Sequence, residues 1–106
     1  MDNITILNPD NSNAWIIYTK SNCSFCYKVK ELLENEPIIT IVNCDELLKN
    51  IGKKDKFLTL IKDIVGCEWR TFPMVFLNNK FIGGYTETKK IFDDKLNCEL
   101  IVNDDF

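Results

Sequence analysis

Apolar residues in the first part of the chain follow helix and strand periodicities in turn. The run AWIIY at residues 14–18, rich in aromatic and β-branched residues and bounded by polar ones, predicts a buried strand. Apolar residues then recur at helical spacing, which predicts a helix over residues 24–35 that ends before Pro37. The almost continuously apolar IITIVNC at residues 38–44 is typical of a central parallel strand.

The second part of the chain predicts two more helices around a hairpin. Residues 52–56 are polar and predict a linker. Apolar residues between 57 and 65 recur at i, i+3, i+4, i+7 and i+8, which predicts an amphipathic helix ended by a glycine. MVFLNNKFIGG predicts a hairpin with strands at residues 74–77 and 80–82. A weaker helix is predicted at residues 86–96.

The predicted order of elements, β-α-β-α-β-β-α, indicates an α/β fold with one mixed sheet. The first β-α-β segment spans about 30 residues, as a right-handed parallel unit does. The hairpin must then pair antiparallel to that unit, and the helices must cover both faces. A chain of 106 residues has room for one domain. We therefore expect a single domain over residues 1–106, with a core at about 14–96 and terminal extensions at 1–13 and 97–106.

Composition excludes several classes of function. A net charge of −3 and a pI near 4.9 provide no basic surface for nucleic acid or an anionic membrane. No apolar run approaches the ~20 residues of a membrane span. The chain has no histidine, which excludes Ser–His–Asp and Cys–His nucleophiles. Residues 1–13 lack the basic flank and apolar run of a secretory signal, and five cysteines without such a signal are typical of the reducing cytosol, so we expect a cytoplasmic protein. We also expect a monomer.

Reactive chemistry is expected at Cys23 and Cys26 in the segment KSNCSFC. Both fall at the predicted junction of the first strand and the first helix. The unpaired N–H groups and the dipole of a helix N-terminus stabilise a thiolate at Cys23, and Lys20 adds positive charge nearby. At such a turn the pair can close a disulfide with little backbone movement, and Cys23 is the sulfur that substrates can reach.

Two other roles for this pair are less well supported. A structural zinc site requires a second C-x-x-C or a histidine pair, whereas Cys44, Cys67 and Cys98 stand alone in the sequence. A permanent disulfide is disfavoured in the reducing cytosol. The C-x-x-C pair within a β-α-β unit therefore predicts thiol–disulfide exchange.

Three motifs in order resemble the glutaredoxin family. They are KSNCSFC from Lys20, TFPMVF from Thr71 and GGYTE from Gly83, and they are most similar to short bacterial glutaredoxins that serve ribonucleotide reductase. The resemblance implies a thioredoxin fold with a four-stranded mixed sheet flanked by helices. It also implies glutathione-dependent reduction of protein disulfides and glutathione mixed disulfides.

The resemblance further implies a glutathione site. Pro73 is expected to be cis and to turn the Phe72 backbone toward the Cys23 sulfur, where it would pair with the cysteinyl part of glutathione. Lys20 would meet the glycine carboxylate. Thr86 and Glu87 would hold the γ-glutamyl end, together with helix N–H groups. The full set of expected glutathione-binding residues is Lys20, Phe25, Thr71, Phe72, Pro73, Gly84, Tyr85, Thr86 and Glu87.

In the implied mechanism the Cys23 thiolate attacks, and Cys26 or glutathione resolves the mixed disulfide. Glutathione is then a redox co-substrate, and no bound prosthetic group is expected. The expected partners are glutathione and disulfide-containing or glutathionylated proteins, with ribonucleotide reductase among them.

Two alternatives stay open. Ser24 replaces the proline found in many members, and some members with serine there hold a [2Fe–2S] cluster between two subunits. In that case Cys23 would be a cluster ligand. The same cysteines would also serve a redoxin that a thioredoxin reductase reduces.

Overall fold

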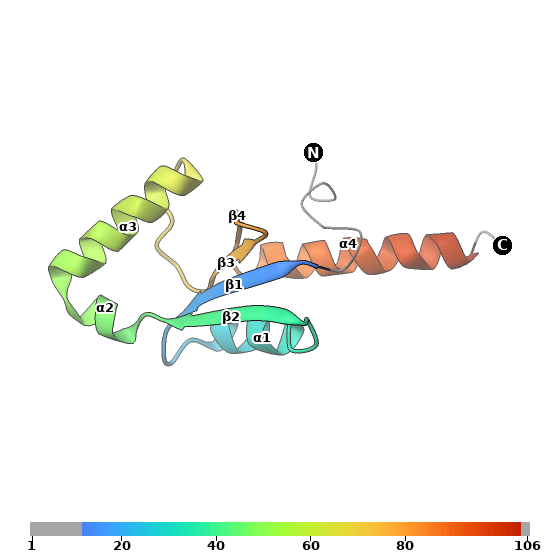
Figure 1. Cartoon of the computed structure of the whole chain (residues 1–106), viewed down its shortest axis with the longest axis horizontal. Coiled ribbons are helices and arrows are strands. Elements are labelled where there is room, and N and C mark those ends of the chain that lie inside the picture. The colour runs from blue at the N-terminus through green and yellow to red at the C-terminus, as the bar shows by residue number, and fades with distance from the viewer. Residues whose placement is uncertain (1–11, 105–106) are drawn as a thin grey trace.

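The structure is a computed structural model that describes residues 12–104, with side chains described up to residue 94. Figure 1 shows the elements along this part of the chain. They are β1 (Ala14–Thr19), α1 (Ser24–Leu32), β2 (Ile38–Asn43), α2 (Asp45–Lys49), α3 (Ile51–Val65), β3 (Met74–Leu77), β4 (Lys80–Gly83) and α4 (Tyr85–Asp104).

The four strands form one mixed sheet in the order β2-β1-β3-β4. β1 pairs parallel to β2 and antiparallel to β3, and β4 completes the hairpin beside β3. The predicted α/β architecture with a mixed four-stranded sheet is confirmed. The prediction that residues 38–44 form a central strand is wrong, because β2 lies at the edge of this sheet and is largely exposed. Because β1 is a central strand, the loop that leaves its end lies beside the segment that enters β3.

Both faces of the sheet carry a hydrophobic core, as the alternation along β1 requires. On one face, Trp15 and Ile17 of β1 pack with residues of α1, and Phe92 of α4 packs against this cluster. On the other face, Leu58 and Ile61 of α3 pack with Met74 and Phe76 of β3. All four residues of β3 are buried because helices cover both of its faces.

α1 is fixed on the sheet by Val29 and Leu33, which are both fully buried in the first core cluster. Val29 lies one turn after Cys26, so the packing of the helix also sets the position of the cysteine pair. α1 lies beside α4 on the same face of the sheet (Figure 1). None of the helices between residues 12 and 104 combines the length and apolar character that a membrane-spanning helix requires.

The prediction of a linker at residues 52–56 is wrong, because α3 begins at Ile51. The side chain of Asn50 caps this helix and accepts a hydrogen bond from the Lys53 N–H at 3.0 Å. The short helix α2 was not predicted either. The first turns of α3 are exposed and no residue of α2 is fully buried, so their residues show no apolar periodicity. Gly66 ends α3 in the left-handed conformation, as predicted.

The last helix is longer than predicted. α4 starts at Tyr85 and extends to Asp104, whereas the sequence predicts residues 86–96. Its added C-terminal part includes most of the predicted extension at residues 97–106. Of the other predicted extension, residues 1–11 lie outside the described residues, as do residues 105–106. The single-domain organisation over residues 1–106 stays a prediction.

Leu33→Ala tests the core between α1 and the sheet, with Leu60→Ala as the matched control. Leu33 is 0% exposed and Leu60 is 56% exposed. Removing the buried side chain should lower the free energy of unfolding by about 2–4 kcal/mol. Removing the exposed Leu60 side chain should change the free energy of unfolding by about 0.5 kcal/mol or less. Urea unfolding followed by circular dichroism measures both, and equal losses would show that Leu33 is not a core residue.

Candidate active site

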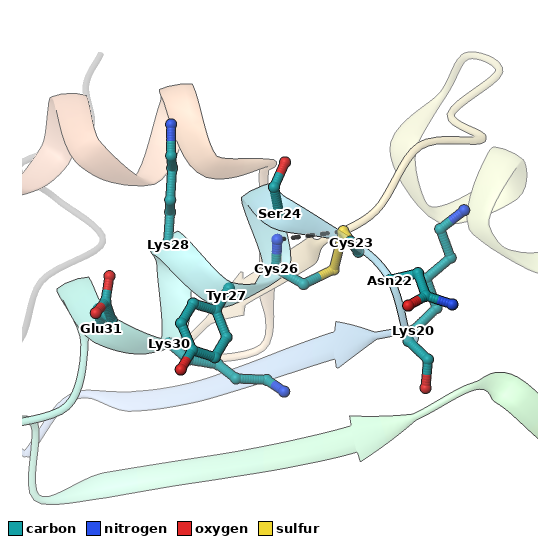
Figure 2. Close-up of a pocket in the computed structure, with 10 residues that line it drawn as sticks. Lys20, Asn22, Cys23, Ser24, Cys26, Tyr27, Lys28, Lys30 and Glu31 are labelled. Carbon is teal, nitrogen blue, oxygen red and sulfur yellow. Dashed lines mark hydrogen bonds between the residues drawn. A yellow bond between two sulfur atoms is a disulfide. The ribbon is translucent and has the colours of Figure 1, made fainter.

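Cys23 and Cys26 form a disulfide at the start of α1, with their Cα atoms 5.2 Å apart (Figure 2). Cys23 is the N-cap residue of the helix and is partly exposed, while Cys26 is 2% exposed. The predicted order of the two sulfurs therefore agrees with their exposure, since a substrate can approach Cys23 more readily than Cys26.

The N-terminus of α1 is directed at the Cys23 sulfur. The Cys26 N–H donates a hydrogen bond to Cys23 Sγ at 3.2 Å. In the reduced protein the same N–H group and the positive end of the helix dipole would stabilise a Cys23 thiolate. The sequence position of Cys23 thus corresponds to a site at which the thiolate is favoured.

The segment that precedes β3 contacts the same sulfur, because β3 lies beside β1 in the sheet. The Phe72–Pro73 peptide bond is cis, as predicted, and the Phe72 carbonyl oxygen lies 3.6 Å from Cys23 Sγ. The Lys20 ammonium lies 6.0 Å from the centre of the Phe72 ring. Residues about fifty positions apart in the sequence are therefore neighbours at the disulfide.

A pocket of about 370 Å³ lies in this region and has the size of a small-molecule site. It is lined by Trp69 and by eight of the nine predicted glutathione-binding residues. Those eight are Phe25, Thr71, Phe72, Pro73, Gly84, Tyr85, Thr86 and Glu87. Lys20, the ninth, lines a neighbouring hollow together with Cys23. The structure brings the predicted set together, and glutathione binding by these residues stays a prediction.

One wall of this pocket is aromatic. The rings of Phe25 and Tyr85 stack with their centres 5.9 Å apart. The Lys28 ammonium lies 5.2 Å from the centre of the Phe25 ring and 5.8 Å from that of Tyr85. Phe25 is half exposed, so its ring is accessible to a ligand in the pocket.

The opposite end of the pocket is the N-terminus of α4. Glu87 Oε1 accepts a hydrogen bond from the Gly84 N–H at 2.8 Å and so caps this helix. A Cβ atom at Gly83 would lie 2.8 Å from the Glu87 side chain, and Gly83 has φ +133°, so this position requires glycine. One carboxylate oxygen of Glu87 therefore caps the helix. The contact of Glu87 with the γ-glutamyl group stays a prediction.

Trp69 is a pocket residue that sequence reasoning missed. Its ring packs edge-on against Phe81, with the ring centres 5.0 Å apart. Its indole Nε1 is buried without a hydrogen-bond partner among the described residues. The only signal in the sequence is a tryptophan in an otherwise polar segment two residues before Thr71.

Asp45 was also missed, and it anchors the loop that carries Lys20 and Cys23. Its carboxylate accepts hydrogen bonds from the Ser21 N–H, at 2.8 Å, and from the Ser21 hydroxyl. The hydroxyl hydrogen bond, followed by the backbone one, lowers the pKa of Asp45. The two residues are 24 positions apart, so no local pattern predicts the contact.

Cys44 and Cys67 line neither of the two hollows beside the disulfide. Cys44 is buried, and burial followed by the charge of Asp45 raises the pKa of its thiol, which therefore stays protonated near neutral pH. Cys67 is exposed and free, in the segment after α3. The side chain of Cys98 lies outside the described part of the chain.

Comparison with known proteins agrees with the geometry. The family model for glutaredoxins matches residues 16–82. The chain belongs to the glutaredoxin family. Mitochondrial glutaredoxin-2 from Bos taurus is 28% identical over 81 residues, which are 76% of this chain and 48% of the relative. This glutaredoxin thus spans about half the length of the mitochondrial relatives that it matches.

Solved glutaredoxin structures share the fold. Glutaredoxin 1 from Francisella tularensis, complexed with cacodylate, has a TM-score of 0.65 and 27% identity, over 81% of this chain and 99% of that one. The buckwheat glutaredoxin–glutathione complex has a TM-score of 0.62 and 26% identity, over 80% of this chain and 73% of that one. The predicted thioredoxin fold is confirmed.

Asp45→Asn tests the anchor of the active-site loop through its pH dependence. The folded protein holds the pKa of Asp45 below its ordinary value of 3.8, so the unfolded chain takes up the proton more readily. The stability contributed by the carboxylate is present above that ordinary value and is lost as the pH falls through the folded pKa. Urea unfolding at several pH values should therefore show that the free energy of unfolding declines less steeply below about pH 4 in Asp45→Asn than in the wild type.

The matched control is Asp63→Asn, which removes an exposed carboxylate that forms no ion pair within residues 12–94. The free energy of unfolding of Asp63→Asn should change with pH in parallel to that of the wild type. An Asp45→Asn profile that is also parallel would show that the Ser21 contact does not stabilise the fold.

Proposed function

We propose that this glutaredoxin is a glutathione-dependent thiol–disulfide oxidoreductase that reduces protein disulfides and glutathione mixed disulfides. The observation that supports this most is the position of the partly exposed Cys23 sulfur. It lies at the N-terminus of α1 and in contact with the Phe72 carbonyl, and Phe72 lines the adjoining pocket. The buckwheat relative, whose structure is a complex with glutathione, gives independent support.

The reaction begins with the reduced pair. The Cys23 thiolate attacks the glutathione sulfur of a glutathionylated protein, the old S–S bond breaks, and the protein cysteine leaves as a thiolate that takes up a proton. A second glutathione thiolate then attacks the mixed disulfide on Cys23, which releases glutathione disulfide and restores the Cys23 thiolate. With a protein disulfide as substrate, the Cys26 thiolate resolves the mixed disulfide and forms the Cys23–Cys26 disulfide.

The proposed binding mode of glutathione is based on its charged groups. Lys20, next to the Phe72 ring, would bind the glycine carboxylate. The N–H groups at the start of α4, around Thr86, would bind the γ-glutamyl carboxylate. The Phe72 backbone would pair with the cysteinyl residue, which brings the glutathione sulfur to Cys23.

The proposed setting is the cytoplasm, where glutathione keeps the pair reduced. The proposed partners are glutathione and disulfide-containing or glutathionylated proteins. Ribonucleotide reductase as a substrate and the monomeric state are expectations from the resemblance alone.

Of the alternatives, a [2Fe–2S] carrier would need cluster ligands in addition to the side chains of residues 12–94. Within residues 12–94 no group of three or more Cys, His, Asp and Glu side chains could hold a metal ion. Reduction by a thioredoxin reductase uses the same two sulfurs and needs no pocket for glutathione. An enzyme assay with each reductant distinguishes it from the proposed reaction.

Substitution of each active-site cysteine tests the proposed roles. Turnover of a glutathione mixed disulfide of hydroxyethanethiol, coupled to glutathione reductase and NADPH, should be abolished in Cys23→Ser. It should persist in Cys26→Ser, because glutathione resolves the intermediate on Cys23. Reduction of a protein disulfide should fall sharply in both variants. Equal and total loss of the first activity in both variants would contradict these roles.

Lys20→Gln tests the proposed glycine carboxylate contact. Removal of this exposed charge should raise KM for the mixed disulfide by about threefold to tenfold. It should leave kcat nearly unchanged, because the N-terminus of α1 still stabilises the Cys23 thiolate. Lys54→Gln, on the exposed side of α3, is the matched control and should change neither constant. A fall in kcat with an unchanged KM would assign Lys20 to activation of Cys23 instead.

A further inference from the structure

A second hollow adjoins the disulfide and runs along α1 (Figure 2). This α1 groove is lined by residues 20–24, 26–28, 30 and 31 and has a volume of about 760 Å³. It includes Cys23 but shares no lining residue with the proposed glutathione pocket. Two different hollows therefore border the active site. In the proposed reaction glutathione fills the first of them and contacts the second only at Cys23 and Lys20.

The α1 groove is basic although the protein is acidic. Lys20, Lys28 and Lys30 line it, with Glu31 as its one acidic residue, whereas the whole chain has a net charge of −3. None of these three lysines forms an ion pair within residues 12–94. Figure 2 shows Lys28 and Lys30 leaving α1 on opposite sides and Lys20 beside the disulfide. Positively charged side chains therefore line the groove from the disulfide along α1.

An exposed aromatic side chain lies among these lysines. Tyr27 directly follows Cys26 and is 69% exposed. Tyrosine is enriched at protein–protein interfaces because a large apolar ring and a hydroxyl share one side chain. A solvent-exposed tyrosine contributes little to the fold, so its position in the groove favours contact with a partner.

The chemistry of a glutathionylated protein explains why a second hollow is needed. Its cysteine carries glutathione on one side and its own polypeptide on the other. When the glutathione part fills the pocket at Phe72 and Tyr85, the polypeptide must leave Cys23 along a different surface. The α1 groove meets this requirement, because Cys23 forms part of its lining.

We propose that the α1 groove binds an acidic segment next to the reacting cysteine of a protein substrate. This inference rests on the proposed function and adds the chemistry of its partner. Carboxylates of the segment would pair with Lys30, and Tyr27 would contact its apolar atoms. The lysines would also attract an acidic partner at a distance, against the net charge of the chain.

The test uses two peptides with a single glutathionylated cysteine. One has Asp and Glu around the cysteine, and the other has Asn and Gln at the same positions. At low ionic strength the wild type should show a kcat/KM about threefold to tenfold higher for the acidic peptide. This preference should shrink with added salt, since the charges are exposed.

Lys30→Glu should abolish or invert the preference, and the milder Lys30→Gln should reduce it. Lys54→Glu makes the same change of net charge on α3 and should retain the preference. All three variants should turn over the hydroxyethyl mixed disulfide at the wild-type rate. Equal kcat/KM for the two peptides in the wild type would overturn the proposal, as would a loss in Lys54→Glu as large as that in Lys30→Glu.

Binding without chemistry separates this proposal from the proposed function. The same two peptides, labelled and with serine in place of cysteine, are titrated with the protein and followed by fluorescence anisotropy. Tighter binding of the acidic peptide that Lys30→Glu removes would support the groove even where turnover is absent, and equal binding would overturn it. Absence of turnover with the hydroxyethyl substrate would instead contradict the proposed function alone.

Discussion

The hydrogen bond from the Cys26 N–H to the Cys23 sulfur is the interaction on which the active site depends. It makes a reactive side chain the cap of α1, so one contact both begins the helix and directs its positive end at the sulfur. The helix holds this position because Val29 and Leu33 are buried against the sheet. Packing of the core therefore determines where the sulfur lies and how exposed it is.

Segments far from the cysteines complete the site because β1 is central in the sheet. The antiparallel pairing of β1 with β3 places the segment before β3, with its cis proline, next to Cys23. The hairpin with β4 then brings the glycine pair and the start of α4 to the same pocket. The parallel pairing with β2 brings Asp45 to Ser21 on the other side of the loop.

Two hollows adjoin the Cys23 sulfur, and we propose that each binds a different part of a mixed disulfide. The pocket between the aromatic wall and the start of α4 suits a small ligand with charges at both ends. The basic groove along α1 suits a longer and acidic chain. In the proposed reaction a glutathione mixed disulfide has one part of each kind, so it would contact both surfaces at once when its S–S bond lies at Cys23. Apart from Lys20, different residues would then determine the specificity for glutathione and for the protein part.

The sequence by itself determined the strands, α1, the turn at Gly66, the cysteine pair and, through the family motifs, the cis proline and eight residues of one pocket. Apolar periodicity and the geometry of turns are local, so a linear pattern records them. Only the tertiary structure decided the start of α3 at Ile51 and the existence of α2, because exposed helices need no apolar stripe. It alone also decided the contact of Asp45 with Ser21, the place of Trp69 in the pocket and the basic groove. These depend on strand register and helix packing, which bring together side chains that no local pattern relates.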